Sequence, residues 1–245
     1  MAAVDRTAGI IIIGNEILSG KVVDTNAPFL TRELRAIGVT LKRILTIPDE
    51  VDEIAEAVKE FRPRYDVVFT SGGVGPTHDD VTMEGIAKGL GRRLVRHPAI
   101  ESRLREFYKE HVNDARLKMS EVPEGAELLV DGRLGFPTVK CENFYILPGI
   151  PELFEQKFEA LRERFSATPY TMRVVYTREG EGSIAEHLNA TLAAFPELLL
   201  GSYPKLSHPE YTVKLTLESK DPEYVNRALA HLLQLLPAEA IVRTE

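Results

Sequence analysis

The sequence has little of what several protein classes require. It holds a single cysteine, Cys141, so no internal disulfide can form, and this usage fits a reducing compartment. No stretch approaches the ~18 consecutive apolar residues of a membrane-spanning helix. The net charge of −7 provides no basic footprint for nucleic acid or for an anionic membrane. We therefore expect a cytoplasmic protein whose partners are small molecules rather than nucleic acids or membranes.

What the chain does contain is the composition of a globular protein. Its 245 residues are 44% hydrophobic and 27% charged, which suits one large domain or two smaller ones. The apolar runs Ile10–Ile13 and Val67–Phe69 do not alternate with polar residues, as is typical of strands covered on both faces. Strand and helix patterns alternate as far as Gly91, which predicts a doubly wound, mostly parallel α/β sheet. The expected strands are Thr7–Ile13, Val39–Ile47 and Asp66–Phe69, and the expected helices run from Thr25 or Asn26 to Ile37, from Val51 to Phe61 and from Met83 to Leu90.

After Gly91 the pattern is less regular. The polar stretch Asn113–Lys118 is interpreted as a mobile excursion or the end of a helix. Val139–Leu147 is interpreted as one strand or as two pieces broken at Glu142-Asn143. The other expected elements are short strands at Arg92–Arg96 and Leu128–Val130 and helices at Ala99–Glu110 and Glu152–Phe165.

The segment Ala167–Pro169 marks a domain boundary. We expect a larger domain at residues 1–168 and a smaller one at residues 169–245. The predicted order in the smaller domain is β-α-β-β-α-β, the ferredoxin-like split motif of an α+β fold. This domain is acidic and has no cluster of aromatic and basic residues, so we interpret it as a packing or dimerisation domain.

The most informative stretch is Thr70–Thr82, where a buried strand ends, a glycine-rich loop turns and a helix begins. Ligands of open α/β sheets bind outside the carboxyl ends of the strands. The glycines within Gly72–Gly75 let the backbone approach a ligand and point its amides at phosphate. Asp79 and Asp80 would repel bare phosphate, so a divalent cation between them and a phosphorylated ligand would reconcile the two features. In the alternative interpretation, Asp80 or Thr82 is simply the N-cap of the helix.

The sequence of the same loop does not match several standard motifs. No lysine follows the glycines, so it is not a P-loop, and it does not fit G-x-G-x-x-G either. Ser71 lacks a G-x-S-x-G context, and with Thr70 it is interpreted as a hydrogen-bond donor rather than a nucleophile. His78 is interpreted as a polar loop residue, with a base or a metal ligand as the alternative.

Three further loops follow predicted strands. They are Gly14-Asn15-Glu16, Asp49-Glu50 and Pro148-Gly149-Ile150-Pro151. In a parallel sheet all of these loops and the glycine-rich one lie at one edge, so we expect a single ligand pocket there. The carboxylates available to it are Glu16, Asp24, Asp49, Asp79 and Asp80.

Taken together, these motifs resemble the molybdopterin-binding MoaB/Mog family. Thr70–Thr82 runs close to its T-x-G-G-x-G-P-x-x-x-D-x-T signature. The branch that is most similar comprises the N-terminal part of competence/damage-inducible protein A (CinA) and the molybdopterin-binding-like domain of eukaryotic FAD synthases. The likeness covers roughly residues 7–165, and residues 170–245 resemble the small KH-like domain that follows in CinA. The further matches are Gly14–Gly20, Asp24–Asn26, Ile47–Glu50 and Leu147–Glu152.

The resemblance implies a three-layer α/β fold, a homo-oligomer (dimer or trimer) and a phosphate-bearing ligand at the glycine loop. In family members that adenylylate molybdopterin, acidic residues matching Asp49 and Asp80 lie at the active site. In the CinA and FAD-synthase branch the resemblance implies a pyrophosphatase that acts on ADP-ribose or FAD with cobalt or magnesium and with potassium. Gly135–Thr138 replaces the A-P-G sequence usual in CinA and is closer to the FAD-synthase type, which leaves the two substrates open. The C-terminal amidase of full-length CinA has no counterpart in this sequence, so its activity is not expected.

Two functions therefore stand as hypotheses. The first is a metal-dependent pyrophosphohydrolase of nucleotide diphosphates that releases AMP, with Asp49 and Asp80 as catalytic residues and Glu16, Asp79 and Asp80 as metal ligands. The alternative is a non-catalytic module that binds molybdopterin or a nucleotide and is linked to molybdenum cofactor biosynthesis. The predicted ligand-binding residues are Gly14, Asn15, Glu16, Asn26, Thr70, Ser71, Gly72, Gly73, Gly75, Pro76, Thr77, Pro148 and Gly149.

Overall fold

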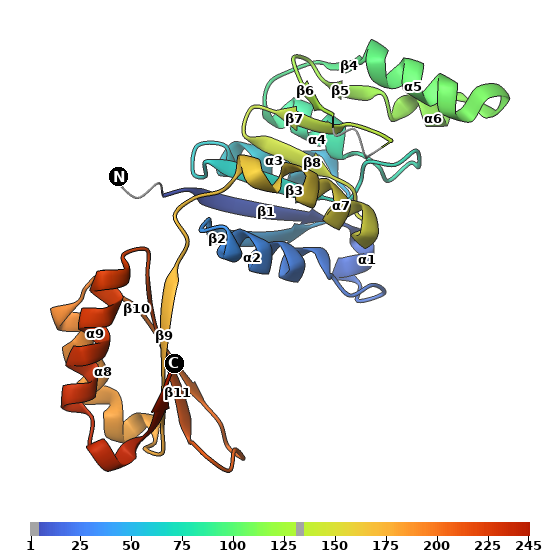
Figure 1. Ribbon diagram of the computed structural model, residues 1–245. Coiled ribbons are helices and arrows are strands. Elements are labelled where there is room, and N and C mark those ends of the chain that lie inside the picture. The colour runs from blue at the N-terminus through green and yellow to red at the C-terminus, as the bar shows by residue number, and fades with distance from the viewer. Residues whose placement is uncertain (1–4, 131–134) are drawn as a thin grey trace. The chain divides into compact units, whose positions relative to one another are not determined.

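The computed structural model describes residues 5–130 and 135–245, and the predicted domain start at residue 1 lies outside them. The chain divides into two compact units between Ala167 and Thr168 (Figure 1). Each unit has its own sheet and its own hydrophobic core. Among the described residues, no helix is both long enough and apolar enough to cross a membrane.

The first unit is built on a six-stranded sheet in the order β2-β1-β3-β8-β7-β6. Its four strands β2, β1, β3 and β8 run parallel, and β7 and β6 are antiparallel to their neighbours. The predicted mostly parallel sheet is therefore confirmed. The strands are β1 (Thr7–Ile13), β2 (Thr40–Ile47), β3 (Val67–Ser71), β6 (Glu127–Leu129), β7 (Thr138–Cys141) and β8 (Phe144–Leu147).

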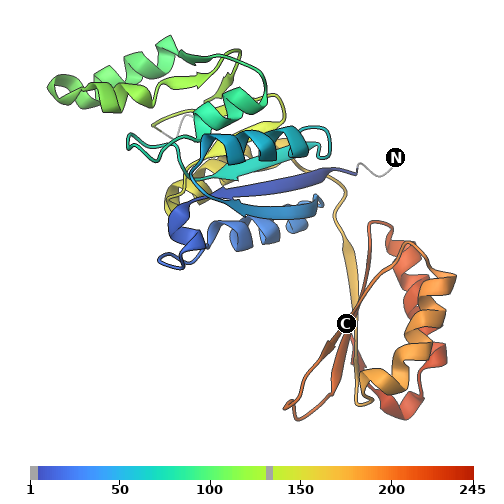
Figure 2. The same ribbon diagram turned by 180° about the vertical axis from the view of Figure 1, so that it is seen from behind.

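Helices cover both faces of this sheet, which makes three layers (Figures 1 and 2). Helices α2 (Asn26–Ala36) and α7 (Pro151–Leu161) pack on one face, and α3 (Val51–Phe61) and α4 (Thr82–Gly89) pack on the other. Within Ile10–Ile13, the odd-numbered isoleucines contact the α3 and α4 layer, and the even-numbered ones contact the α2 and α7 layer. This two-sided burial explains why the run is apolar without alternation.

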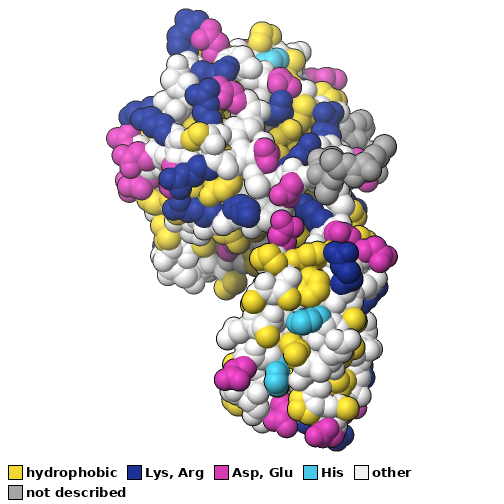
Figure 3. Space-filling view, turned by 90° about the vertical axis from the view of Figure 1, so that its left-hand side faces the viewer, with side chains coloured by type: hydrophobic (Ala, Val, Ile, Leu, Met, Phe, Trp, Pro, Cys, Tyr) yellow, Lys and Arg dark blue, Asp and Glu magenta, His cyan; other side chains and the backbone are white. Residues whose placement is uncertain are grey.

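The stretch at 139–147 forms two strands, the second of the two alternatives considered. Glu142 in the turn has a φ of 53°, and its carboxylate pairs with Arg62 at 2.5 Å and Arg92 at 2.9 Å. These ion pairs are partly exposed, so each contributes little to stability. Figure 3 shows one side of the first unit, where Lys and Arg are interspersed with Asp and Glu rather than forming a uniformly basic surface.

An excursion rich in helix separates the short antiparallel strands β4 and β5. The polar stretch expected to be mobile or a helix end forms a helix of its own, because the Asn113 side chain accepts the backbone N–H of Arg116 at 2.9 Å. Pairing of β4 with β5 brings the two ends of the excursion together. Its elements are β4 (Leu94–Arg96), α5 (Pro98–Tyr108), α6 (Asp114–Lys118) and β5 (Glu121–Pro123).

The second unit has a four-stranded antiparallel sheet in the order β10-β11-β9-β12. Helix α8 connects β9 to β10, and β11 lies between these two strands in the sheet. Helix α9 connects β11 to β12, and β9 lies between those two. This interleaving is the split β-α-β arrangement, so the ferredoxin-like prediction is confirmed. The elements are β9 (Thr171–Thr177), α8 (Glu181–Ala194), β10 (Leu199–Pro204), β11 (Val213–Ser219), α9 (Pro222–Leu235) and β12 (Ile241–Thr244).

A lysine inside the first unit is held by neutral groups. Lys157 of α7 donates from Nζ to the carbonyl oxygens of Phe136 and Pro137, at 2.9 and 3.1 Å, and to Oγ1 of Thr138 at 3.5 Å. Burial lowers the pKa of Lys157 from 10.5 to about 8, because a desolvated ammonium is disfavoured.

This lysine should make stability depend on pH. Because its folded pKa is about 8 and its unfolded value 10.5, the unfolded chain binds more protons between these values, and stability rises with pH across that window. We expect Lys157→Met, which keeps an apolar stem without a charge, to abolish a rise on the order of 1–2 kcal/mol after allowance for solvent screening. Urea unfolding of the unaltered and the Lys157→Met proteins, near pH 8 and near pH 10.5, measures this rise. All other titrating groups are the same in the two proteins, so the difference between them reports Lys157. If the stability of the two proteins depended on pH in the same way, the lowered pKa of Lys157 would be contradicted.

Candidate functional site

The predicted loops follow the carboxyl ends of the parallel strands, at the right-hand side of the first unit in Figure 1. Backbone hydrogen bonds tie them together in pairs. The N–H of Gly14 donates to the Ile47 carbonyl at 3.1 Å, and the N–H of Gly72 donates to the Leu147 carbonyl at 3.3 Å. The ends of β1 and β2, and those of β3 and β8, are thereby joined, and the short helix α1 (Asn15–Leu18) starts at this edge.

The glycine loop, Gly72–Asp80, starts with two residues that require glycine. Gly72 has a φ of 103°, and an added Cβ would lie 2.2 Å from the backbone oxygen of Ile13. Gly73 has a φ of 64°, and its Cβ would lie 2.3 Å from Oγ1 of Thr82. That Thr82 hydroxyl donates to the Gly72 carbonyl at 2.9 Å. The loop therefore packs directly against the end of β1 and the start of α4.

Asp80 closes the glycine loop from within. Its carboxylate accepts the N–H of Gly75 at 2.6 Å, the N–H of Thr77 at 2.8 Å and the Thr77 hydroxyl at 2.5 Å. The N-cap of α4 is Val81, and no side chain caps that helix. The alternative in which Asp80 or Thr82 serves only as a cap is therefore wrong, because Asp80 shapes the loop and Thr82 lies inside the helix.

Asp79, the residue before Asp80, faces outward. Its side chain is 56% exposed, and Oδ1 lies 3.9 Å from Nδ1 of His78. Thr77 and the backbone N–H of Asp79 itself hold the pKa of this carboxyl below its usual range, with smaller contributions from His78 and Lys118. Asp79 is therefore ionised at neutral pH and presents a charge to solvent.

A hollow of about 560 Å³ opens beside this carboxylate, a volume typical of small-molecule sites. It includes Asp49, whose Oδ2 accepts the N–H of Asn15 at 2.7 Å and so holds the first turn of α1 against the end of β2. Its lining residues are Asn15, Glu16, Leu18, Ser19, Lys21, Asp49 and Asp79. Three predicted carboxylates from three strand-end loops thus share one hollow.

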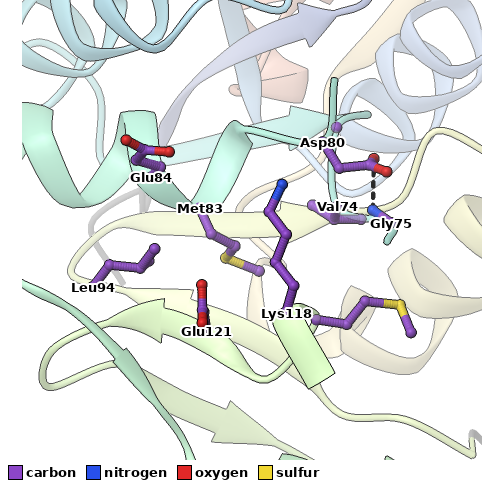
Figure 4. Close-up of a pocket in the computed structure, with 10 residues that line it drawn as sticks. Val74, Gly75, Asp80, Met83, Glu84, Leu94, Lys118 and Glu121 are labelled. Atoms are coloured by element: carbon purple, nitrogen blue, oxygen red, sulfur yellow. Dashed lines mark hydrogen bonds between the residues drawn. The ribbon is translucent and has the colours of Figure 1, made fainter. Parts of the chain in front are cut away.

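A second, smaller hollow is lined in part by the glycine loop (Figure 4). Gly73, Gly75 and Asp80 contribute to it together with Met83 and Glu84 of α4. Lys118 points into it and donates to the Thr77 carbonyl at 3.2 Å (Figure 4). Sequence reasoning missed Lys118, because only the pairing of β4 with β5 brings the end of the excursion to the glycine loop.

Asn26 connects α2 to two of the loops. It is 5% exposed, and its Nδ2 donates to Oγ of Ser71 and to the carbonyl of Gly149, both at 2.9 Å. Its Oδ1 is buried and has no hydrogen-bond partner among the described residues, and the same holds for Oγ1 of Thr70. A buried acceptor without a partner costs about 1–3 kcal/mol, so Asn26 Oδ1 is a group that a ligand donor or a water could satisfy.

The start of α2 explains how Asn26 is oriented. Oδ1 of Asp24 accepts the backbone N–H groups of Asn26 and Ala27, at 2.9 and 3.2 Å. Thr25 occupies the N-cap position, but its side chain makes no cap hydrogen bond. Thr25 is thus the N-cap by position, and the side-chain acceptor for the first turn comes from Asp24, the residue before it.

The remaining predicted residues are distributed around the edge. Thr70 is fully buried inside β3, on the side of α3 and α4. Pro76 and Thr77 are exposed in the glycine loop. Oγ of Ser71 donates to the carbonyl of Pro148 at 3.5 Å, so this proline contributes its backbone rather than its ring.

The side chains around the hollow can be compared with the ligands that the predicted metal ion needs. Among the residues that the structure describes, no group of three or more His, Cys, Asp and Glu lies close enough to hold a metal ion. Magnesium is usually bound by one or two carboxylates together with the phosphates of a substrate. Glu16, Asp49 and Asp79 line one hollow, which fits a cation that arrives with a phosphorylated ligand and does not fit a metal held by protein alone.

Comparison with known proteins gives a consistent result. Residues 9–167 match the model of probable molybdopterin-binding domains, and residues 169–245 match that of the FAD synthase middle domain. A protein of Archaeoglobus fulgidus is 38% identical over 93% of this chain and 96% of its own length. A probable FAD synthase of Caenorhabditis briggsae is 32% identical over 94% of this chain, which spans about half (50%) of that enzyme.

Among solved structures, CinA from Thermoplasma acidophilum, described as having unknown function, is 32% identical with a TM-score of 0.61. The match covers 66% of this chain and 98% of the solved one. The matched length therefore corresponds to the length of the first unit.

Proposed function

Because the chain belongs to the family of probable molybdopterin-binding domains, we propose that its first unit binds a phosphorylated nucleotide or pterin at the carboxyl edge of the sheet. The observation that carries this proposal is the hollow of about 560 Å³ bounded by Glu16, Asp49 and Asp79. It lies where open α/β sheets bind their ligands. The backbone N–H groups of Gly73 and Val74, for which no hydrogen bond is found within the described residues, are the donors that the glycine loop offers to a phosphate.

The proposed reaction is hydrolysis of a nucleotide diphosphate such as ADP-ribose or FAD. Water adds to one phosphorus atom and the P–O–P bridge breaks, which yields AMP and the other monophosphate. A divalent cation such as Mg²⁺ or Co²⁺, with K⁺ as a further helper, would be held by Glu16 and Asp79 together with the ligand, and would supply charge neutralisation and activation of water. Asp49, which keeps Asn15 and α1 in place and lines the hollow, would act as the base. The relatives named FAD synthase favour a substrate of this class.

The test is release of AMP from ADP-ribose and from FAD in the presence of Mg²⁺ or Co²⁺. Asp49→Asn keeps an acceptor for the Asn15 N–H but removes the charge, so we expect AMP release to fall by roughly 100-fold or more with little change in stability. Glu56→Gln is the matched control, because Glu56 is an exposed carboxylate of α3 outside the hollow. Absence of AMP with either substrate, or an Asp49→Asn protein as active as the unaltered one, would refute the hydrolase.

The second candidate is binding of molybdopterin without turnover. The match to probable molybdopterin-binding domains favours it. Calorimetry with molybdopterin distinguishes the two functions: saturable binding that Asp49→Asn weakens, together with no AMP release, would establish the binding module and exclude the hydrolase.

A further inference from the structure

The chain reverses direction in a tight turn after α1, at residues 18–23, which we call the α1 turn. The carbonyl oxygen of Glu16 accepts the N–H of Val22 at 3.1 Å and the hydroxyl of Ser19 at 3.3 Å. Gly20 has a φ of 71°, a conformation that glycine adopts without strain. Figure 1 shows this part of the chain extending from the carboxyl edge of the sheet before it returns to α2. These bonds hold the α1 turn next to Glu16, which lines the large hollow.

The α1 turn contributes a cation to this hollow. The carboxylates of Glu16, Asp49 and Asp79 line it, and Lys21 is the one lysine or arginine among the described residues that do so. Within the described part of the chain, no hydrogen bond or ion pair engages the ammonium of Lys21, and none of the three carboxylates is paired with it. The charge of Lys21 is therefore available to an anionic ligand.

The charges in the hollow have to be balanced when a diphosphate enters it. The three carboxylates repel an anion, and a disubstituted diphosphate such as that of ADP-ribose brings two more negative charges. A divalent cation held by Glu16 and Asp79 would neutralise the charge near one phosphate. The positive charge that remains for the other phosphate is that of Lys21, and a lysine binds phosphate as a point charge.

The α1 turn also presents apolar surface. Leu18 lines the hollow although its side chain is 53% exposed. Val22 and Val23, in the same turn, are 50% and 81% exposed. Turns are usually built from glycine, proline and small polar residues, and ligand pockets combine apolar walls with a few charged groups. Because Leu18 and Lys21 belong to one turn and line one hollow, a ligand that reaches Lys21 with a phosphate can place a ring against Leu18.

We propose that the α1 turn is the subsite that selects a nucleotide with two phosphates. Lys21 binds the phosphate that the divalent cation does not hold, and Leu18 packs against the base or another ring of the ligand. A ligand with a single phosphate leaves Lys21 without its partner, so the subsite favours nucleotide diphosphates over a pterin monophosphate. This inference rests on the proposed function, because it concerns the same hollow.

The test of Lys21 is calorimetry on the full chain with Mg²⁺ and three probes. α,β-Methylene-ADP cannot be hydrolysed at its bridge, methylenediphosphonate lacks the nucleoside, and AMP lacks the second phosphate. Lys21→Gln should weaken binding of the first two probes by roughly 10-fold or more and that of AMP by less than about threefold. Lys21→Arg should restore most of the lost affinity, because it returns the charge.

The test of Leu18 uses the same probes. Leu18→Ala should weaken binding of α,β-methylene-ADP by roughly fivefold or more, because it removes apolar contact with the ligand. It should leave methylenediphosphonate unaffected, since that probe has no ring. The matched controls are Lys42→Gln and Leu206→Ala, because both side chains are exposed and neither is among the described residues that line the hollow. Both controls should bind all three probes as the unaltered protein does.

Two results would overturn the subsite while the proposed function stands. One is a Lys21→Gln protein that binds α,β-methylene-ADP as tightly as the unaltered protein, and the other is equal weakening of α,β-methylene-ADP and methylenediphosphonate by Leu18→Ala. An unaltered protein that binds none of the probes would refute the nucleotide site itself, and the subsite with it. The expected pattern of binding without any AMP release would support the subsite and refute only the hydrolase. Circular dichroism and thermal unfolding establish that each variant is folded.

Discussion

Substituting alanine for Gly72 is expected to destabilise the first unit by about 3 kcal/mol or more and to abolish ligand binding. The added Cβ would lie 2.2 Å from the backbone oxygen of Ile13, an overlap that no side-chain rotation can relieve. The residue also has a φ of 103°. Backbone strain of this kind and overpacking each cost about 1–3 kcal/mol. Relief requires the glycine loop to move away from the end of β1, and the site then loses its geometry.

The matched control is Gly91→Ala. Gly91 also has a positive φ, of 67°, but an added Cβ would meet nothing within 4 Å. Its substitution should cost only about 1 kcal/mol, the penalty of the backbone conformation alone. Urea unfolding of both variants, with ligand binding by calorimetry, measures the difference. Equal destabilisation by the two substitutions would show that contact with Ile13 is not what requires a glycine at position 72.

The central part of the fold could be predicted because its signals are local. The unbroken apolar run Ile10–Ile13 indicates a strand covered on both faces, and the helical periodicity of Val51–Phe61 indicates the covering helix. Since parallel strands place their carboxyl ends at one edge, the convergence of the loops around Asp49 and Asp79 also followed. The structure brings both into one hollow.

The direction of individual side chains could not be predicted in this way. Asp79 and Asp80 are adjacent in sequence, yet one faces solvent and the other closes the glycine loop. The direction of each carboxylate depends on the local backbone of the loop and on the donors that surround it, and sequence spacing carries no record of either. Both aspartates were therefore predicted as metal ligands, Asp80 also as a catalytic residue.

Contacts between distant segments could not be predicted from the sequence, for a different reason. Lys118 lies 41 residues from Thr77, whose carbonyl it contacts, and the two meet only because β4 pairs with β5. Asn26 similarly reaches Gly149, 123 residues away. Such contacts depend on strand order and register, which local patterns do not determine.

Asp80→Ala is expected to open the glycine loop and to reduce AMP release by roughly 100-fold or more. The substitution removes three hydrogen bonds, from the N–H and hydroxyl of Thr77 and the N–H of Gly75. Because these donors can turn to water, the loss in overall stability should stay near about 1–2 kcal/mol, much smaller than the loss in activity. Hydrogen exchange at the two amides should accelerate.

The comparison with Asp79→Ala separates a positioning role from a charge effect. Asp79 is the adjacent carboxylate and is 56% exposed, so its removal deletes the same charge from the loop without removing the bonds that close it. We expect Asp79→Ala to raise the concentration of Mg²⁺ or Co²⁺ needed for AMP release while exchange at Gly75 and Thr77 stays slow. Asp80→Ala should accelerate that exchange at every metal concentration. If both variants left exchange unchanged and lost activity equally, Asp80 would act through its charge, and the closed loop would not be its contribution to the site.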